Sequence, residues 1–179
     1  VANEPSLLQF EGGTETRSFL FMLDHILSLG LDDETIIYSV EDDYIHKPGW
    51  DTVIQEPFEK GIEHVTLYDH QDKYTSMYNG LSSQIITTKS CHWRTTPSTT
   101  NTFAVKLKTL KKYEETYRKY SNKDELITRD HDRFLDLWKQ GSSLVSAVPG
   151  FSTHMEPEVA SPFTNWKEIH DKYLHIHSR

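Results

Sequence analysis

Three consecutive carboxylates, Glu41, Asp42 and Asp43, directly follow an apolar and β-branched segment over residues 35–40. Clustered anions raise one another's pKa unless a cation joins them. A hard divalent cation such as Mg²⁺ or Mn²⁺ takes oxygen ligands, and when one or two carboxylates hold it, it commonly also binds a diphosphate. The alternative is a solvated acidic turn, and the place of the triplet after a strand-forming segment balances the two interpretations.

Two further residues that could take part in catalysis or metal binding lie later in the chain. Asp130 stands at the start of an amphipathic segment, where the helix dipole favours a carboxylate as a cap, but it could equally serve as a general base. His154 lies in a predicted loop, where a lone histidine is more often a surface residue. Imidazole nitrogen also binds first-row divalent ions such as Mn²⁺, so both interpretations of His154 stay open.

The surrounding elements alternate between strands and helices. The strands are predicted at residues 6–10, 35–40, 64–68, 84–88 and 143–148, and the helices at 14–29, 50–60 with a break at Pro57, the later part of 102–120, 130–140 and 165–174. This alternation predicts an α/β fold with a mainly parallel sheet. The apolar run at 35–40 is typical of a strand buried on both faces. Ligands of such sheets bind at the carboxyl ends of the strands, where the acidic triplet would lie.

Composition excludes several classes of protein. The 179 residues carry a formal net charge of −8, which disfavours nucleic acid as a partner. No stretch approaches the roughly 20 apolar residues of a membrane span. Cys91 is the single cysteine, so no internal disulfide can form and a reducing, cytoplasmic location is expected.

The length predicts one domain over residues 1–179, with a core at 6–166 and a terminal helix and tail at 167–179. The chain begins at Val1 and enters a strand-like run almost at once, so we expect that earlier elements of the fold have been left out.

An apolar strand ending in acidic residues, followed later by an Asp-led helix, a glycine, a strand, a proline and a histidine, resembles the nucleotide-sugar glycosyltransferases of the GT-A fold. The resemblance covers residues 6–166. It implies that Asp43, the last carboxylate of the motif, binds the metal, and that Glu41 lies near the ribose or the donor sugar. His154 corresponds to the late metal-binding histidine of this family.

The family's catalytic base, in members that invert the anomeric centre, is the Asp of a Glu-Asp or similar pair that opens a helix. Asp130 stands at this place, with Arg129 where Glu is commoner. That departure leaves Asp132 as the alternative base.

Other stretches resemble glycosyltransferases of bacteria and large viruses, including N-terminal domains of multi-domain chlorovirus enzymes, and so imply further domains in a longer chain. They include Tyr68-Asp69-His70 and His92-Trp93-Arg94. The resemblance implies that His92, Trp93 and Arg94 line the acceptor pocket and that Asp69 and His70 contact donor or acceptor. The alternatives are core packing for Trp93 and a surface ion pair for Arg94.

The expected activity is therefore transfer of a sugar from a nucleoside-diphosphate sugar, UDP-linked by family resemblance, to a hydroxyl group of a glycan, with Mn²⁺ or Mg²⁺ as cofactor. Three other classes of function remain open. They are a metal-dependent nucleotidyltransferase or phosphohydrolase, a non-catalytic carbohydrate-binding module, and an interaction domain.

Overall fold

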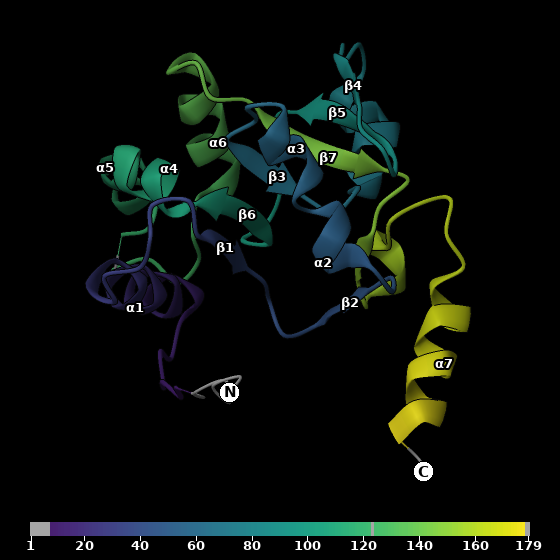
Figure 1. Ribbon diagram of the computed structural model, residues 1–179, viewed down its shortest axis with the longest axis horizontal. Coiled ribbons are helices and arrows are strands. Elements are labelled where there is room, and N and C mark those ends of the chain that lie inside the picture. Colours follow the sequence, from purple (N-terminus) through teal and green to yellow (C-terminus); the bar gives the residue numbers. More distant parts are fainter. Residues whose placement is uncertain (1–7, 123, 178–179) are drawn as a thin grey trace.

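The computed structural model describes residues 8–122 and 124–177 of the chain (Figure 1). The helices are α1 (Glu15–Ser28), α2 (Trp50–Val53), α3 (Glu56–Glu59), α4 (Leu107–Lys112), α5 (Glu114–Lys119), α6 (Asp130–Lys139) and α7 (Trp166–His177), with short 3₁₀ helices η1 (Gln71–Tyr74), η2 (Ser76–Tyr78) and η3 (Pro157–Val159). The strands are β1 (Ile36–Ser39), β2 (Tyr44–His46), β3 (His64–Thr66), β4 (Ile85–Thr87), β5 (His92–Thr96), β6 (Phe103–Lys106), β7 (Leu144–Val148) and β8 (Ser152–His154).

The central sheet has six strands in the order β1-β6-β3-β7-β5-β4, and β2 pairs with β8 in a separate small sheet. Only β3 and β7 pair in parallel, whereas the other neighbours in the six-stranded sheet are antiparallel. The α/β class is confirmed, but the prediction of a mainly parallel sheet is wrong. The reason is that β5 and β6 enter the sheet in the reverse direction, each after a loop rather than after a helical crossover.

The first strand also differs from its prediction. We expected residues 35–40 to be buried on both faces, but β1 is the edge strand of the sheet and Ile36, Ile37 and Tyr38 are only partly buried. The predicted strand at 6–10 begins outside the described residues, and residues 8–10 form no strand.

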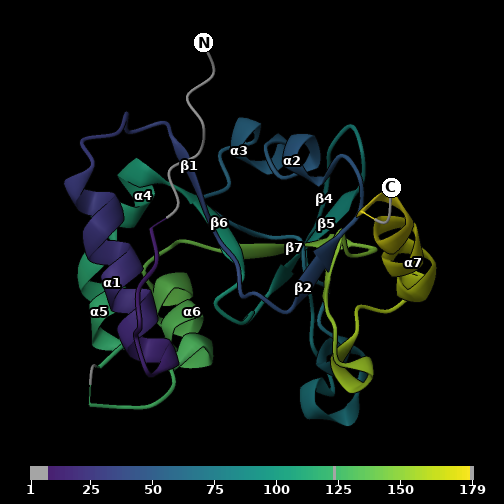
Figure 2. The ribbon, with the colours of Figure 1, turned by 90° about the horizontal axis from the view of Figure 1, so that it is seen from below.

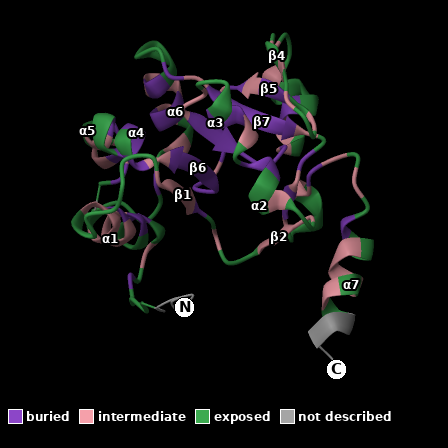
Figure 3. Cartoon of the chain, in the orientation of Figure 1, coloured by how far each residue is buried: buried purple, intermediate pink, exposed green. Residues whose placement is uncertain are grey.

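Helices cover both faces of the sheet, as Figure 2 shows with α2 and α3 on one side and α6 on the other. One hydrophobic cluster joins α1, α4, α5 and α6 to the sheet and includes Phe19, Phe103 and Phe134. The second lies under α2 and α3 and includes Trp93. The strands are the most buried part of the chain, and the outer helix surfaces are exposed (Figure 3). Within the described residues, no helix is long and apolar enough to cross a membrane.

Local signals in the sequence explain the helices well. The Thr14 hydroxyl caps α1 by accepting a hydrogen bond from the backbone N–H of Arg17 at 3.2 Å. The helix at 50–60 breaks into α2 and α3, and Pro57 lies in the first turn of α3, where its missing N–H costs nothing. Gly141 follows α6 with a φ of 91°, a left-handed conformation that ends the helix.

Candidate functional site

Asp43 and His154 lie side by side although 111 positions separate them in the chain (154 − 43). Nε2 of His154 is 2.9 Å from Oδ2 of Asp43. The Asp43 side chain is about half exposed and the His154 ring largely buried, with 48% and 18% of their surfaces accessible. The structure thus brings together the two residues that the family resemblance implies as metal ligands.

The small β2–β8 sheet holds this pair in place. Tyr44 is the register partner of His154, and the backbone N–H of Met155 donates to the Asp43 carbonyl at 2.9 Å. β8 is in turn tied to the end of β3, because the backbone N–H groups of Phe151 and Ser152 both donate to the Leu67 carbonyl. His154 therefore reaches Asp43 through backbone pairing, which fixes its position more firmly than a loop would.

The connection before β8 contains a glycine, Gly150, at a place where a larger residue would not fit. Gly150 lies against Ser161 and Asp69, and a Cβ at this position would stand 2.8 Å from the Ser161 Oγ and 3.2 Å from the Asp69 Cβ. The Ser161 hydroxyl donates to the Ser152 carbonyl at 2.8 Å. A side chain at position 150 would thus push β8 away from the end of β3.

The donor set of Asp43 and His154 fits a divalent cation of the Mn²⁺ type, which accepts both carboxylate oxygen and imidazole nitrogen. Nδ1 of His154 accepts a hydrogen bond from the Glu156 backbone N–H at 3.2 Å, so its proton lies on Nε2, facing Asp43. A metal at Nε2 requires the other tautomer, and the long Glu156 contact must then open. No third His, Cys, Asp or Glu of the described residues completes a cluster, so further ligands would come from water or phosphate.

The other two carboxylates of the triplet lie in different environments. Asp42 is exposed to solvent. Glu41 is partly buried, and its Oε2 accepts from the Thr102 hydroxyl at 3.4 Å. Burial raises the pKa of Glu41, an effect opposed by the Thr100 hydroxyl and reinforced by the charge of Glu15.

Asp130, the first residue of α6, lines a cavity of about 520 Å³ together with His70, Lys73 and His131. Its Oδ1 accepts from the His131 backbone N–H at 2.8 Å. Burial raises the pKa of Asp130, although the charge of Arg133 opposes the rise. A carboxylate with a raised pKa at a cavity wall has the properties of a general base.

The alternative base, Asp132, has a different environment. Its Oδ2 accepts from Arg129 Nη2 at 2.6 Å and from Nε at 2.9 Å in an ion pair on the outside of the helix. Asp132 is not among the residues that line the cavity. The geometry therefore favours Asp130 over Asp132 as the candidate base.

A short chain of contacts joins the Asp43 and His154 pair to this cavity. Thr100 lines the cavity, and its hydroxyl lies 3.0 Å from the Tyr44 hydroxyl. The Tyr44 ring packs edge-on against the ring of His154, with their centroids 5.3 Å apart. Tyr44 and Thr100 thus link the candidate metal ligands to the cavity of the candidate base, although His154 itself lines a different cavity, together with Phe163 and Trp166.

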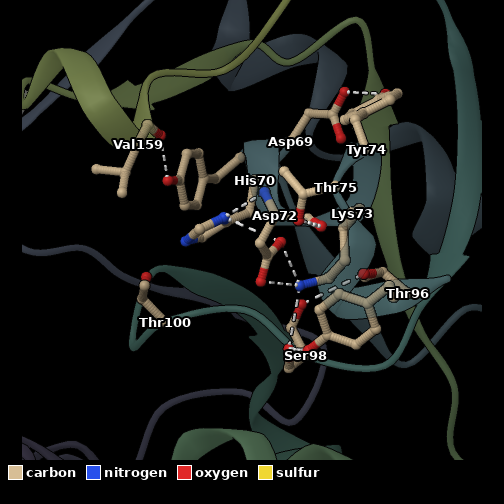
Figure 4. A network of polar contacts seen from close by, with 12 residues as sticks. Asp69, His70, Asp72, Lys73, Tyr74, Thr75, Thr96, Ser98, Thr100 and Val159 are labelled. Carbon is tan, nitrogen blue, oxygen red and sulfur yellow. Dashed lines mark hydrogen bonds and ion pairs between the residues drawn. The ribbon is translucent and has the colours of Figure 1, made fainter.

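Lys73 also lines the cavity, and nothing in the sequence pattern singled it out. Its side chain is 2% exposed, and its ammonium donates to both carboxylate oxygens of Asp72 and to the Ser98 hydroxyl (Figure 4). The ammonium also lies over the Tyr78 ring, 4.3 Å from its centroid. Burial alone would raise the pKa of Asp72, but hydrogen bonds from His70 and Lys73 outweigh it and the pKa is lowered. The three ammonium hydrogens of Lys73 are thus taken by Asp72 and Ser98, and Lys73 holds the cavity wall in place.

His70 lines the cavity as expected, but Asp69 faces the protein interior. Asp69 is fully buried, and its carboxylate accepts from Arg94 Nη2 at 2.6 Å and from the Tyr74 hydroxyl at 2.7 Å. Burial raises the pKa of Asp69, and these two hydrogen bonds oppose the rise without cancelling it. The expected substrate contacts of Asp69 and Arg94 are therefore corrected to a buried ion pair, which forms because Arg94 of β5 and Asp69, three residues after β3, both have buried side chains that meet at 2.6 Å.

The remaining acceptor-pocket predictions also change. Trp93 is fully buried in the core under α2 and α3, because it alternates with Arg94 along β5 and faces the other side of the sheet. Its indole N–H donates to the Thr88 hydroxyl at 2.8 Å. His92 is exposed at the start of β5 and is not one of the cavity residues. The alternative of core packing thus holds for Trp93.

Beneath the cavity wall, Arg133 is a fully buried cation that sequence patterning did not reveal. Its guanidinium donates to the Asn101 carboxamide oxygen at 2.7 Å and lies over the rings of Phe19 and Phe103. Its Nε and Nη1 make no hydrogen bond within the described residues. Arg133 supplies positive charge behind Asp130 and Glu41, which stabilises their ionised forms.

Comparisons of the chain with protein families, with curated proteins and with solved structures give no match.

Proposed function

We propose that this protein is a metal-dependent glycosyltransferase that moves a sugar from a nucleoside-diphosphate sugar, most simply a UDP-sugar, to a hydroxyl group of a glycan. The observation that carries the proposal is the contact between Asp43 and His154, 2.9 Å apart, which Tyr44 and Thr100 link to the cavity lined by Asp130. The oxygen and imidazole donors offer a cation site, and the partly buried carboxylate of Asp130, whose pKa is raised, offers a general base.

In this proposal Asp43 and His154 hold a divalent cation, Mn²⁺ or Mg²⁺. Such a cation, when bound, neutralises the charge of a departing diphosphate. The residues on the cavity side do the rest. The hydroxyls of Ser98 and Thr100 line the cavity and offer hydrogen bonds to the donor or acceptor, whereas the three ammonium hydrogens of Lys73 are taken by Asp72 and Ser98.

The transfer step itself is a displacement at the anomeric carbon, in the inverting course. The acceptor oxygen forms a bond to the anomeric carbon as the bond between that carbon and the diphosphate oxygen breaks. Asp130 takes the proton of the acceptor hydroxyl, and the nucleoside diphosphate leaves with the electron pair. Burial raises the pKa of Asp130, which makes it a stronger base than an exposed aspartate.

The test is a thermal-shift screen of UDP-, GDP- and dTDP-sugars with and without Mn²⁺. A ligand present at 100 times its Kd adds about 2.7 kcal/mol to the free energy of unfolding, which for a chain of this size raises Tm by roughly 5–11 °C. We expect the shift to need Mn²⁺ and to disappear in Asp43→Asn. The matched control is Asp51→Asn, an equal loss of charge at an exposed site on α2.

The proposal fails if no nucleotide sugar changes Tm in the presence of metal. Product analysis separates the rival functions. Release or transfer of the sugar supports a glycosyltransferase, whereas nucleotidyl exchange or release of phosphate from simple esters identifies the metal-dependent rival. Binding of a glycan without any metal dependence identifies a carbohydrate-binding module.

A further inference from the structure

A second cavity of about 500 Å³ is lined by three segments of the chain that also line the first. η2 lines the first cavity with Met77 and Tyr78, and the segment after η2 lines the second with residues 81–84. The end of β5 and the residue after it line the second cavity with residues 95–97, and the following residues 98–100 line the first. α6 contributes its first turn to the first cavity and its later turns to the second.

One face of α6 makes this continuity explicit. His131 lines the first cavity, and Leu135 and Trp138 line the second. These positions are four and three residues apart, so they form a single stripe on the helix. From Asp130 to Trp138 the helix rises by about 12 Å. The two cavities together therefore have the reach of a short oligosaccharide rather than of one sugar.

The second cavity differs from the first in its chemistry. Its lining residues include no Lys, Arg, His, Asp or Glu, although a quarter of the chain is charged. It offers hydroxyl groups from Ser82, Ser83 and Ser143 and the carboxamide of Gln84. These four side chains make no hydrogen bond to other described residues, so their donors and acceptors face the cavity or solvent.

Trp138 is the conspicuous apolar group at this cavity, with 64% of its surface exposed. By contrast, Trp93 is fully buried and Trp166 is 9% exposed. An exposed indole beside uncharged polar groups is matched to a pyranose ring, which has an apolar C–H face and a rim of hydroxyls. The negative face of the indole ring attracts the weakly positive C–H groups.

We propose that the cavity beside Trp138 is a subsite for neutral sugar units, which binds the remote part of an oligosaccharide acceptor whose reacting end lies at Asp130. The placement of the reacting end rests on the proposed glycosyltransferase function, whereas the binding of neutral sugars rests on the cavity alone. The ligand class is an uncharged glycan of several units.

The test is titration of the protein with maltotetraose, cellotetraose, xylotetraose and chitotetraose, followed by tryptophan fluorescence and calorimetry. We expect at least one of these to change the emission of Trp138 and protect it from acrylamide quenching. Trp138→Ala should weaken binding of that glycan at least tenfold, and Trp138→Phe, which keeps a ring, should weaken it less. Leu126→Ala, which removes a 74% exposed side chain elsewhere, is the control and should bind as the wild type does.

The outcomes separate this inference from the proposed function. Loss of glycan binding in Trp138→Ala supports the subsite even if no nucleotide sugar binds, and the protein is then a glycan-binding module. Where transfer is found, Trp138→Ala should raise KM for a long acceptor and leave kcat for a short one unchanged. The inference is overturned if none of the four glycans binds, if Trp138→Ala binds them as the wild type does, or if polygalacturonate binds more tightly.

Discussion

The ion pair between Asp69 and Arg94 offers the sharpest test of the structural reasoning, because sequence analysis had placed both residues in a substrate pocket. Asp69 is fully buried, and the Arg94 side chain is only 11% exposed. Replacing Arg94 by Met keeps the length of the side chain but leaves the Asp69 carboxylate with the Tyr74 hydroxyl as its one side-chain partner among the described residues.

Breaking a buried ion pair from one side costs about 3–5 kcal/mol, because the remaining charge is buried without compensation. For a chain of this size, each kcal/mol lowers Tm by roughly 2–4 °C, so Arg94→Met should melt about 6–20 °C lower. The second variant is Arg94→Met with Asp69→Asn, which removes the orphaned charge. We expect it to recover at least about 1 kcal/mol of the loss, the order of the interaction energies seen in such cycles.

Urea denaturation at pH 8 and pH 5 measures these changes. A buried carboxyl with a raised pKa destabilises the fold as pH rises through that pKa, so Arg94→Met should lose more stability at pH 8 than at pH 5. Arg118→Met is the control, because Arg118 pairs with Asp24 and Glu114 at the surface, and it should cost at most about 1 kcal/mol. A cost for Arg94→Met as small as that of the control, or a double variant no more stable than the single one, would refute the reasoning.

Three further predictions concern other residues. Asp130→Asn should lower kcat about 10²–10⁴-fold, whereas Asp132→Asn should stay close to the wild type. The acidic limb of the pH profile of kcat/KM should lie above the usual Asp pKa, because burial raises the pKa of Asp130. Equal losses of kcat in the two variants would contradict the choice of Asp130 as the base. His64 is fully buried, and burial lowers its pKa to about 3. The imidazole is therefore protonated in the unfolded chain before it is in the folded one, and the free energy of unfolding falls by about 4 kcal/mol as pH drops from about 6.5 to about 3. Urea denaturation over this pH range tests this, and a His64→Gln variant whose unfolding free energy has the same pH dependence as the wild type would contradict it. Trp93→Ala should cost about 3–5 kcal/mol in urea denaturation and leave KM for the acceptor unchanged, and a raised KM at unchanged stability would return Trp93 to the acceptor pocket.

The parts of the fold that were predictable are those that local chemistry decides. The Thr14 cap, the break at Pro57 and the left-handed Gly141 each act within a few residues. Thr14 marks the start of α1, Pro57 lies in the first turn of α3, and Gly141 marks the end of α6. The directions of the strands were not predictable in this way. Whether β5 runs parallel or antiparallel to β7 depends on a pairing across about 50 residues, to which the apolar pattern of each strand is indifferent.

Some residues of the candidate site were likewise predictable from the sequence, and others were not. The residue types of Asp43, Asp130 and His154 indicated a cation site and a base, and the structure places the first and last of these in contact. The types of Lys73 and Arg133 gave no signal, because buried and exposed basic residues look alike in a sequence. What distinguishes the buried ones is their contact with aromatic rings, that of Tyr78 for Lys73 and those of several residues for Arg133. Only the fold brings these groups together.

The two faces of the central strands β3, β7 and β5 differ in their chemistry. On the side of α2 and α3, β3, β7 and β5 present Val65, Val145 and Trp93, an apolar surface. On the side of α6, Leu144 of β7 joins the hydrophobic cluster of that helix, but Thr66, Ser146 and Arg94 of the same strands are buried and polar. Buried polar groups cost free energy unless they are hydrogen-bonded, so a chain selected for stability alone would fill both faces with apolar residues. These buried polar side chains lie on the face covered by α6, whose first residue, Asp130, lines the cavity with Lys73, and we infer that they help to hold that cavity in shape.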